Sequence, residues 1–175
     1  MKLKTRDIVY IGFIAALCVV ATTIRIEVPG GAMVHLGSAA LFTTSILFGG
    51  LYGGLGAAIG SAMFDLFGGH TQYIVFSFFI KGIAGLIVGG MTAGYLPPSI
   101  NKPTASFSRI LVALIIGAIW TAFGYFIAWW FVLNSAAVAA SKIQYSLITS
   151  AAGIVVAIVL TPKLQTIVRR LFTKN

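Results

Sequence analysis

The chain has 175 residues, of which 59% are hydrophobic and 9% are charged, and its mean hydropathy is +1.02. Soluble domains carry about 25% charged residues, so a water-soluble fold of this composition would lack the polar side chains to cover its surface. The net charge of +9 comes from lysines and arginines that gather at loops and termini, which favours anionic lipid over nucleic acid as the neighbour. Composition therefore predicts one integral membrane domain over residues 1–175, with no separate soluble catalytic domain.

Six apolar segments follow one another along the chain. A span needs about 20 apolar residues, so we expect an all-α integral membrane protein with six transmembrane helices, of which the second and third are short. The basic start, with Lys2, Lys4 and Arg6, also fits a secretory signal, but removing it would leave an odd number of spans, so we interpret it as flanking the first helix. The expected helices cover residues 8–24, 36–50, 52–67, 73–95, 109–133 and 143–161.

The second and third segments meet at the glycine-rich stretch 49–54. Because glycine permits a turn and weakens a helix, this stretch predicts a tight helical hairpin, with a single long helix as the alternative. Small residues four positions apart, such as Gly49 and Gly53, let helix backbones approach closely in lipid. We therefore expect most of these glycines to serve helix packing.

The distribution of basic residues indicates the orientation. With an even number of spans both termini share a side, and the two tails and the loop near 96–109 hold most of the lysines and arginines, whereas the opposite loops hold only Arg25 and Lys142. The positive-inside rule then places both termini in the cytoplasm. Arg25 has Glu27 nearby as a pairing partner within its loop. Residues 163–175 are predicted to form a basic amphipathic helix along the cytoplasmic interface.

Polar side chains gather on the outer side of this topology. Lys81 lies inside an apolar segment, where a mid-membrane lysine costs about 2.5–3.5 kcal/mol and normally faces a cavity, a partner or the interface. Tyr73, Ser77 and Lys81 follow one helix face, and Trp130 and Asn134 form a similar pair. Together with the outer loops they predict a cup that opens outward and binds a small molecule. The candidate binding residues are His35, Ser38, Asp65, Tyr73, Ser77, Lys81, Trp130, Asn134, Gln144 and Tyr145.

Several candidates also have a purely structural explanation. Lys81 can extend to the interface or pair with Asp65, and Asp65 can stabilise a loop. Trp130 is also typical of an interfacial aromatic belt. A metal pair of His35 and His70 would have too few supporting ligands, so no metal site is predicted. The chain shows neither a nucleophile with a base nor a GxxxxGK[ST] motif, so we do not expect an enzyme.

Four sequence stretches resemble a known family. They are VHLGS at 34–38, FGGLYG at 48–53, GSAMFDL at 60–66 and IKG at 80–82. These stretches are similar to the substrate-binding S components of energy-coupling factor (ECF) vitamin transporters, most closely those for hydroxymethylpyrimidine, pyridoxine or riboflavin. The likeness covers nearly the whole chain in length and span order, although the last two helices match only in character. Relatives often carry aspartate where this chain has Ser38.

The resemblance implies six helices in a prokaryotic plasma membrane, with a vitamin bound at the extracellular side. It also implies a membrane T component coupled to two cytoplasmic ATPases, so ATP and Mg²⁺ would bind those partners and this chain would carry no cofactor. Small residues on the first helix contact the T component in the family, and the matching positions here are Gly12, Ala15 and Ala16.

The function expected from the sequence is vitamin capture for an ATP-driven importer. Hydroxymethylpyrimidine or pyridoxine is favoured as the substrate, followed by riboflavin. The alternative is a stand-alone small channel or proton-coupled transporter, in which Asp65 and Lys81 would form a proton-responsive pair.

Overall fold

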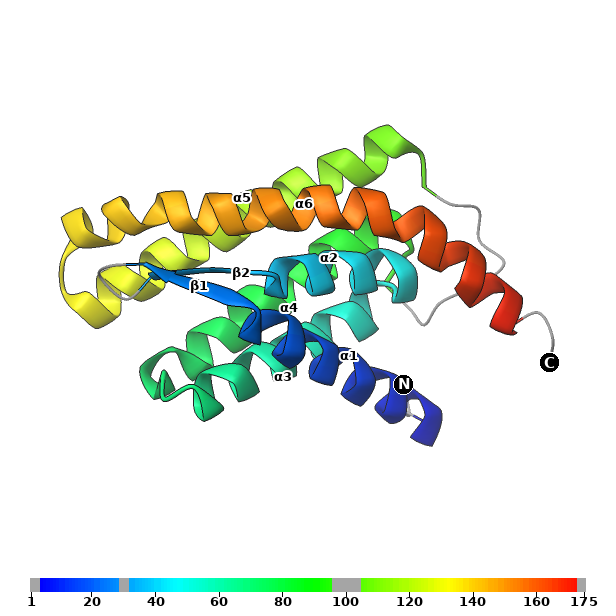
Figure 1. Cartoon of the computed structure of the whole chain (residues 1–175), viewed down its shortest axis with the longest axis horizontal. Coiled ribbons are helices and arrows are strands. Elements are labelled where there is room, and N and C mark those ends of the chain that lie inside the picture. Colours follow the sequence, from blue (N-terminus) through cyan, green and yellow to red (C-terminus); the bar gives the residue numbers. More distant parts are fainter. Residues whose placement is uncertain (1–3, 29–31, 96–104, 173–175) are drawn as a thin grey trace.

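The structure is a computed structural model that describes residues 4–28, 32–95 and 105–172, and it is a bundle of helices with a short β-hairpin (Figure 1). The start of α1 and the end of α6 lie on the right-hand side of Figure 1, and the hairpin and the turn between α5 and α6 lie towards its left. The elements are α1 (Thr5–Thr23), β1 (Arg25–Val28), β2 (Ala32–His35), α2 (Gly37–Phe48), α3 (Gly50–Phe67), the short 3₁₀ helix η1 (Thr71–Tyr73), α4 (Ile74–Thr92), α5 (Phe107–Leu133) and α6 (Ala136–Phe172).

All six helices predicted from the apolar segments are present, with ends that differ by a few residues in the first five. Four segments are long and apolar enough to cross a membrane: Thr5–Thr23, Thr71–Thr92, Phe107–Leu133 and Ala136–Ile167. The second helix, α2, has 12 residues, and the third, α3, has 18. The prediction of a helical membrane bundle is therefore confirmed, and six complete spans remain a prediction.

The all-α class needs one correction, because the segment between α1 and α2 forms a two-stranded antiparallel hairpin. Ile26 pairs with Val34, and β-branched residues at such positions favour extended backbone. The expected pairing of Arg25 with Glu27 is confirmed, since Arg25 Nη2 lies 2.9 Å from Glu27 Oε1. β2 lies against α6 and ends at His35, so the hairpin determines where this histidine lies.

The last helix was expected to end at residue 161, with a separate amphipathic helix over 163–175. Instead α6 continues through Pro162 to Phe172 and bends towards its end in Figure 1. A proline removes one backbone hydrogen bond and bends a helix without always ending it. The side chains of residues 168–175 lie outside the described part, so the amphipathic character of the tail stays a prediction.

The predicted helical hairpin of α2 and α3 is confirmed, and its turn is a single residue. Gly49 has a φ of 85°, a backbone conformation that side chains other than glycine rarely adopt, and α3 begins at the next residue. Further along, an added Cβ on Gly85 of α4 would lie 2.7 Å from the Cα of Gly54 in α3. Glycine therefore permits both the turn and the close contact of α3 with α4.

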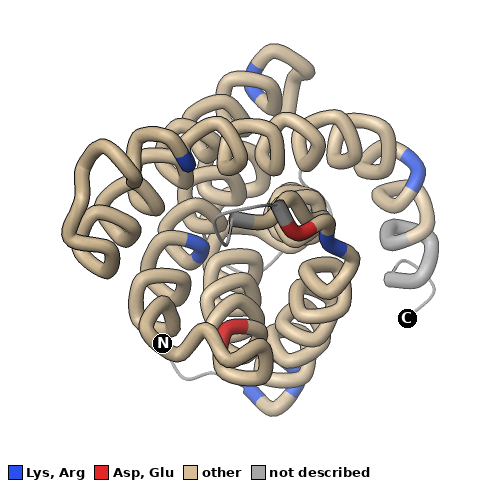
Figure 2. Tube along the Cα trace, turned by 60° about the vertical axis from the view of Figure 1, so that its left-hand side comes forward, with Lys and Arg blue, Asp and Glu red and all other residues tan. Residues whose placement is uncertain are grey.

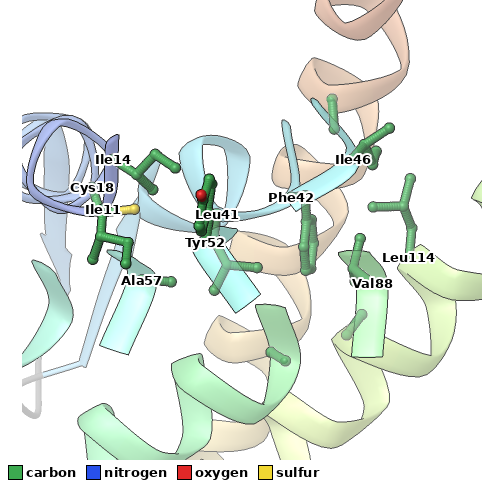
Figure 3. Close-up of a cluster of buried hydrophobic side chains, with 13 residues drawn as sticks. Ile11, Ile14, Cys18, Leu41, Phe42, Ile46, Tyr52, Ala57, Val88 and Leu114 are labelled. Carbon is green, nitrogen blue, oxygen red and sulfur yellow. The ribbon is translucent and has the colours of Figure 1, made fainter. Parts of the chain in front are cut away.

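The core lies where α1 to α6 meet, and Figure 3 shows Ile14, Phe42, Val88 and Leu114 among its side chains. Tyr52 is also in this cluster, and its hydroxyl donates a 2.6 Å hydrogen bond to Oδ1 of Asp7. Charged residues are few along the helices, as Figure 2 shows. Several of the buried polar side chains, among them Asp65, Ser77 and Lys81, lie together at a pocket beside the hairpin.

Candidate functional site

A partly enclosed pocket lies beside the hairpin, and all six helices contribute to its wall. It holds about 800 Å³ of space that protein atoms do not fill, its mouth included. The wall combines hydroxyl groups, aromatic rings, two imidazoles, one carboxylate and one ammonium. The lining residues are Thr22, Met33, His35, Gly37, Ser61, Phe64, Asp65, His70, Tyr73, Ser77, Lys81, Thr121, Tyr125, Trp129, Ser146 and Thr149.

Half of the predicted binding residues meet at this pocket. His35, Asp65, Tyr73, Ser77 and Lys81 line it, although they come from β2, α3, η1 and α4. The stripe along η1 and α4 faces inward as predicted, because residues four positions apart on a helix share a face. These placements show that the polar stripe belongs to a cavity and not to the lipid-facing surface.

Lys81 is buried at the pocket with 4% of its surface exposed. Its Nζ donates a 3.1 Å hydrogen bond to Oγ of Ser38 and lies 5.4 Å from the centre of the Tyr125 ring. An ammonium has three donors, so this one hydrogen bond leaves capacity for a ligand. Ser38 thus belongs to the site as the residue that holds Lys81. No ion pair within 4.0 Å joins Lys81 to Asp65, although both residues are described.

Tyr125 and Trp129 supply the aromatic wall on α5. Their ring centres lie 5.6 Å apart, and the Tyr125 hydroxyl lies 3.0 Å from that of Ser77 on α4. The prediction of Trp130 as a binding residue is wrong in this structure, because Trp130 is 52% exposed, contacts Phe126 and does not line the pocket. Adjacent helical residues point about 100° apart, so only one of two neighbouring tryptophans can share this face.

Three further candidates lie outside the pocket wall. Asn134 is exposed and ends α5 in a left-handed conformation, with a φ of 51°. Gln144 is exposed and Tyr145 is half-buried, and the α6 residues that line the pocket are Ser146 and Thr149. The predicted face of α6 was therefore wrong, because the tertiary packing turns a different side of the helix inward.

A recognisable pattern could have identified the α5 wall from the sequence. Thr121, Tyr125 and Trp129 recur at intervals of four residues, which is the spacing that singled out the stripe on α4. The pair Trp130 and Asn134 lies at the end of the same helix but on a different face. A polar or aromatic series over two helical turns is a stronger indication than one pair near a helix end.

His35 is neutral in this pocket. Its Nδ1 accepts a 3.0 Å hydrogen bond from the backbone N–H of Gly37, which requires an unprotonated nitrogen. Burial, followed by the positive charges of Lys81 and Arg25, lowers the pKa of His35 to about 3. Within the described ranges, no three His, Cys, Asp or Glu side chains lie close enough together to hold a metal ion.

The small residues expected to contact a partner divide between two faces of α1. Gly12 and Ala16 are exposed, and an added Cβ on Gly12 would meet nothing within 4 Å. Ala15 is only 3% exposed and packs against α3 at Gly60. Ala15 is therefore a packing residue in this structure, which corrects its assignment to the expected partner-contact surface.

Apolar helices that enclose a pocket with hydroxyl, aromatic and charged side chains define the chain as a membrane protein of the solute-binding class. Residues 2–166 match the family described as the S component of the ECF-type riboflavin transporter. The chain belongs to this family of ECF transporter S components. The family resemblance in the sequence is thereby confirmed.

Two individual proteins extend this comparison. The solved structure of the S component of a bacterial ECF transporter matches 95% of this chain and 99% of its own, with a TM-score of 0.72 and 18% identity. At this identity the match establishes a common fold. An uncharacterised Pyrococcus woesei protein, encoded in the gap 3′ region, is 28% identical over 142 residues, which are 81% of this chain and 88% of that protein.

Proposed function

We propose that this chain captures a water-soluble vitamin outside the cell and delivers it to an ATP-driven ECF importer. The observation that supports this most directly is a buried lysine, Lys81, facing a polar pocket in a chain of the S-component family. We test riboflavin first, because the family description names it, and then hydroxymethylpyrimidine and pyridoxine, which the sequence motifs favoured.

The pocket suits a planar ring with polar substituents. Tyr125 and Trp129 offer ring faces, and stacked aromatic pairs contribute about 0.5–1.5 kcal/mol beyond the area they bury. Lys81 offers a charged donor, and charge-assisted hydrogen bonds are about twice as strong as neutral ones. A flat heteroaromatic vitamin with ring oxygens or nitrogens would use both features.

Energy for uptake would come from other chains. Membership of the family supports assembly with a membrane T component and two cytoplasmic ATPases, which would bind the ATP and Mg²⁺. In this proposal all six helices embed in the bilayer, both termini lie in the cytoplasm and the pocket opens outside. The exposed residues Gly12 and Ala16 on α1 would contact the T component, because small residues let helices approach closely in lipid.

Tryptophan fluorescence of the purified chain in detergent tests the binding step. Riboflavin, hydroxymethylpyrimidine and pyridoxine are titrated in turn, and at least one should quench the signal at micromolar concentration or below. Trp129→Phe should remove most of that change and Trp130→Phe should retain it, because Trp129 lines the pocket and Trp130 does not. If none of the three binds, and native mass spectrometry finds no co-purified small molecule, the proposal is wrong.

Uptake into lipid vesicles tests the dependence on partners. Vesicles with this chain, a T component and the two ATPases should accumulate the vitamin when ATP is supplied on the ATPase side. Vesicles that hold the chain alone should not. Uptake by the chain alone, driven by a proton gradient, would instead support the stand-alone transporter.

A further inference from the structure

Trp120 of α5 forms a hydrogen bond to the backbone of α4. Its indole N–H donates a 3.0 Å bond to the carbonyl of Ile80, the residue directly before Lys81. A carbonyl oxygen has two lone pairs, so it can accept this bond in addition to one within its own helix. Trp120 itself does not line the pocket. The bond therefore joins the two helices beside Lys81 without using a side chain of the pocket wall.

Gly124 of α5 lies against the same residue of α4. An added Cβ on Gly124 would lie 2.7 Å from Cγ1 of Ile80, with Cγ2 at 3.1 Å and Cδ1 at 3.2 Å. The side chain of Ile80, which is 5% exposed, thus occupies space that any larger residue at this position would need. Residues four positions apart share a helix face, so Trp120 and Gly124 form one contact surface of α5. Two successive turns of α5 therefore hold Ile80.

The rotation of α5 decides where its pocket residues point. Successive residues of a helix are about 100° apart, so fixing the face of Trp120 and Gly124 also fixes the direction of Tyr125. The Tyr125 hydroxyl lies 3.0 Å from that of Ser77, and Nζ of Lys81 lies 5.4 Å from the centre of the Tyr125 ring. A rotation of α5 about its axis would move this ring away from both groups.

We propose that Trp120 is a positioning residue for vitamin binding. Together with Gly124 it fixes the rotation of α5 at which Tyr125 and Trp129 face the pocket. Without the bond to Ile80, the folded chain would spend part of its time in other rotations, and the apparent affinity would fall in proportion to the fraction that can still bind. This inference rests on the proposed function, because it takes the pocket as the vitamin site.

Trp120→Phe tests the hydrogen bond, because phenylalanine keeps a ring and removes the N–H. Riboflavin, hydroxymethylpyrimidine and pyridoxine are titrated by calorimetry, which does not depend on tryptophan emission. For the vitamin that wild type binds, Trp120→Phe should raise the Kd roughly 3- to 10-fold, which is the effect of one neutral hydrogen bond. Trp130→Phe is the matched control and should bind like wild type, since Trp130 is 52% exposed and does not line the pocket.

Gly124→Ala tests the contact with Ile80 by crowding it. The added methyl group should raise the Kd about 10-fold, because the two helices no longer fit in the same rotation. Adding Ile80→Ala should restore the Kd to within about threefold of wild type, because it removes the three atoms that the new Cβ meets. Gly117→Ala is the matched control, since its Cβ would lie 2.7 Å from Cγ2 of Val88, about two turns away along α5. It should lower the melting temperature similarly and leave the Kd close to that of wild type.

The comparison of Kd with melting temperature separates positioning from stability. A Kd is measured on folded protein, so a residue that only stabilises the fold would change the melting temperature and leave the Kd unchanged. Gel filtration and the protection of the buried thiol of Cys18 verify that each variant is folded.

The outcomes also separate this inference from the proposed function. If wild type binds a vitamin and Trp120→Phe keeps the same Kd, the positioning role is refuted and the proposed function stands. Failure of Ile80→Ala to restore binding to Gly124→Ala, or an equal rise in Kd for Gly117→Ala, likewise refutes it. If wild type binds none of the three vitamins, the proposed function fails for them, and this inference fails with it.

Discussion

The substitution Gly85→Ala tests the close packing of α3 on α4. An added Cβ would lie 2.7 Å from Cα and 2.8 Å from N of Gly54, and these backbone atoms cannot rotate away. Carbon atoms pack favourably at about 3.5–4.0 Å, so the two helices would have to separate by about 1 Å. Overpacking of this kind costs about 1–3 kcal/mol.

Gly12→Ala is the matched control, because a Cβ there meets nothing within 4 Å. Alanine has the higher helix propensity by about 1 kcal/mol at both positions, so the difference between the variants isolates the clash. Gly12→Ala should melt at or above the wild-type temperature.

The assay uses Cys18, the one cysteine of the chain, which is 2% exposed and reacts with a thiol dye only when the protein opens. A chain of this size loses about 2–4 °C of melting temperature per kcal/mol, so Gly85→Ala should melt at least about 2 °C below Gly12→Ala. A melting temperature for Gly85→Ala equal to that of Gly12→Ala would refute the packing argument.

Three further predictions concern the pocket and the partner surface. Lys81→Met should raise the vitamin Kd by roughly 10- to 100-fold in the fluorescence titration, because a charge-assisted hydrogen bond is lost, while the melting temperature stays near wild type; unchanged affinity would remove Lys81 from the site. Burial lowers the pKa of His35 to about 3, so between pH 6.5 and 3 this imidazole is protonated in the unfolded chain and neutral in the folded one. The free energy of unfolding should therefore fall as the pH drops from about 6.5 towards 3. Melting temperatures measured at a series of pH values should fall less steeply for His35→Asn than for wild type. The same fall in both proteins would contradict this role of His35. Gly12→Leu with Ala16→Leu should spare vitamin binding and reduce co-purification with the T component, whereas intact co-purification would exclude this face as the contact.

Hydropathy and residue type were sufficient to predict much of the fold of this protein and part of its site. A bilayer requires long apolar helices, so the six helices could be located from the sequence. The glycine-rich stretch 49–54 correctly predicted a turn, which the structure places at Gly49. Lys81 was identified because a lysine in an apolar segment is costly unless it faces a cavity. The regular spacing of Tyr73 and Ser77 then indicated which side of α4 faces inward.

Tertiary structure decided which faces of the other helices meet. Trp129 and Trp130 are adjacent residues of the same type, so the sequence does not distinguish them. The rotation of α5 against α4 places Trp129 in the pocket. Ala15 and Ala16 are likewise adjacent small residues, and the packing of α3 buries one and leaves the other exposed. Helix formation depends on local bonds and apolar length, whereas the rotation of a helix about its axis depends on contacts with residues far away in the sequence.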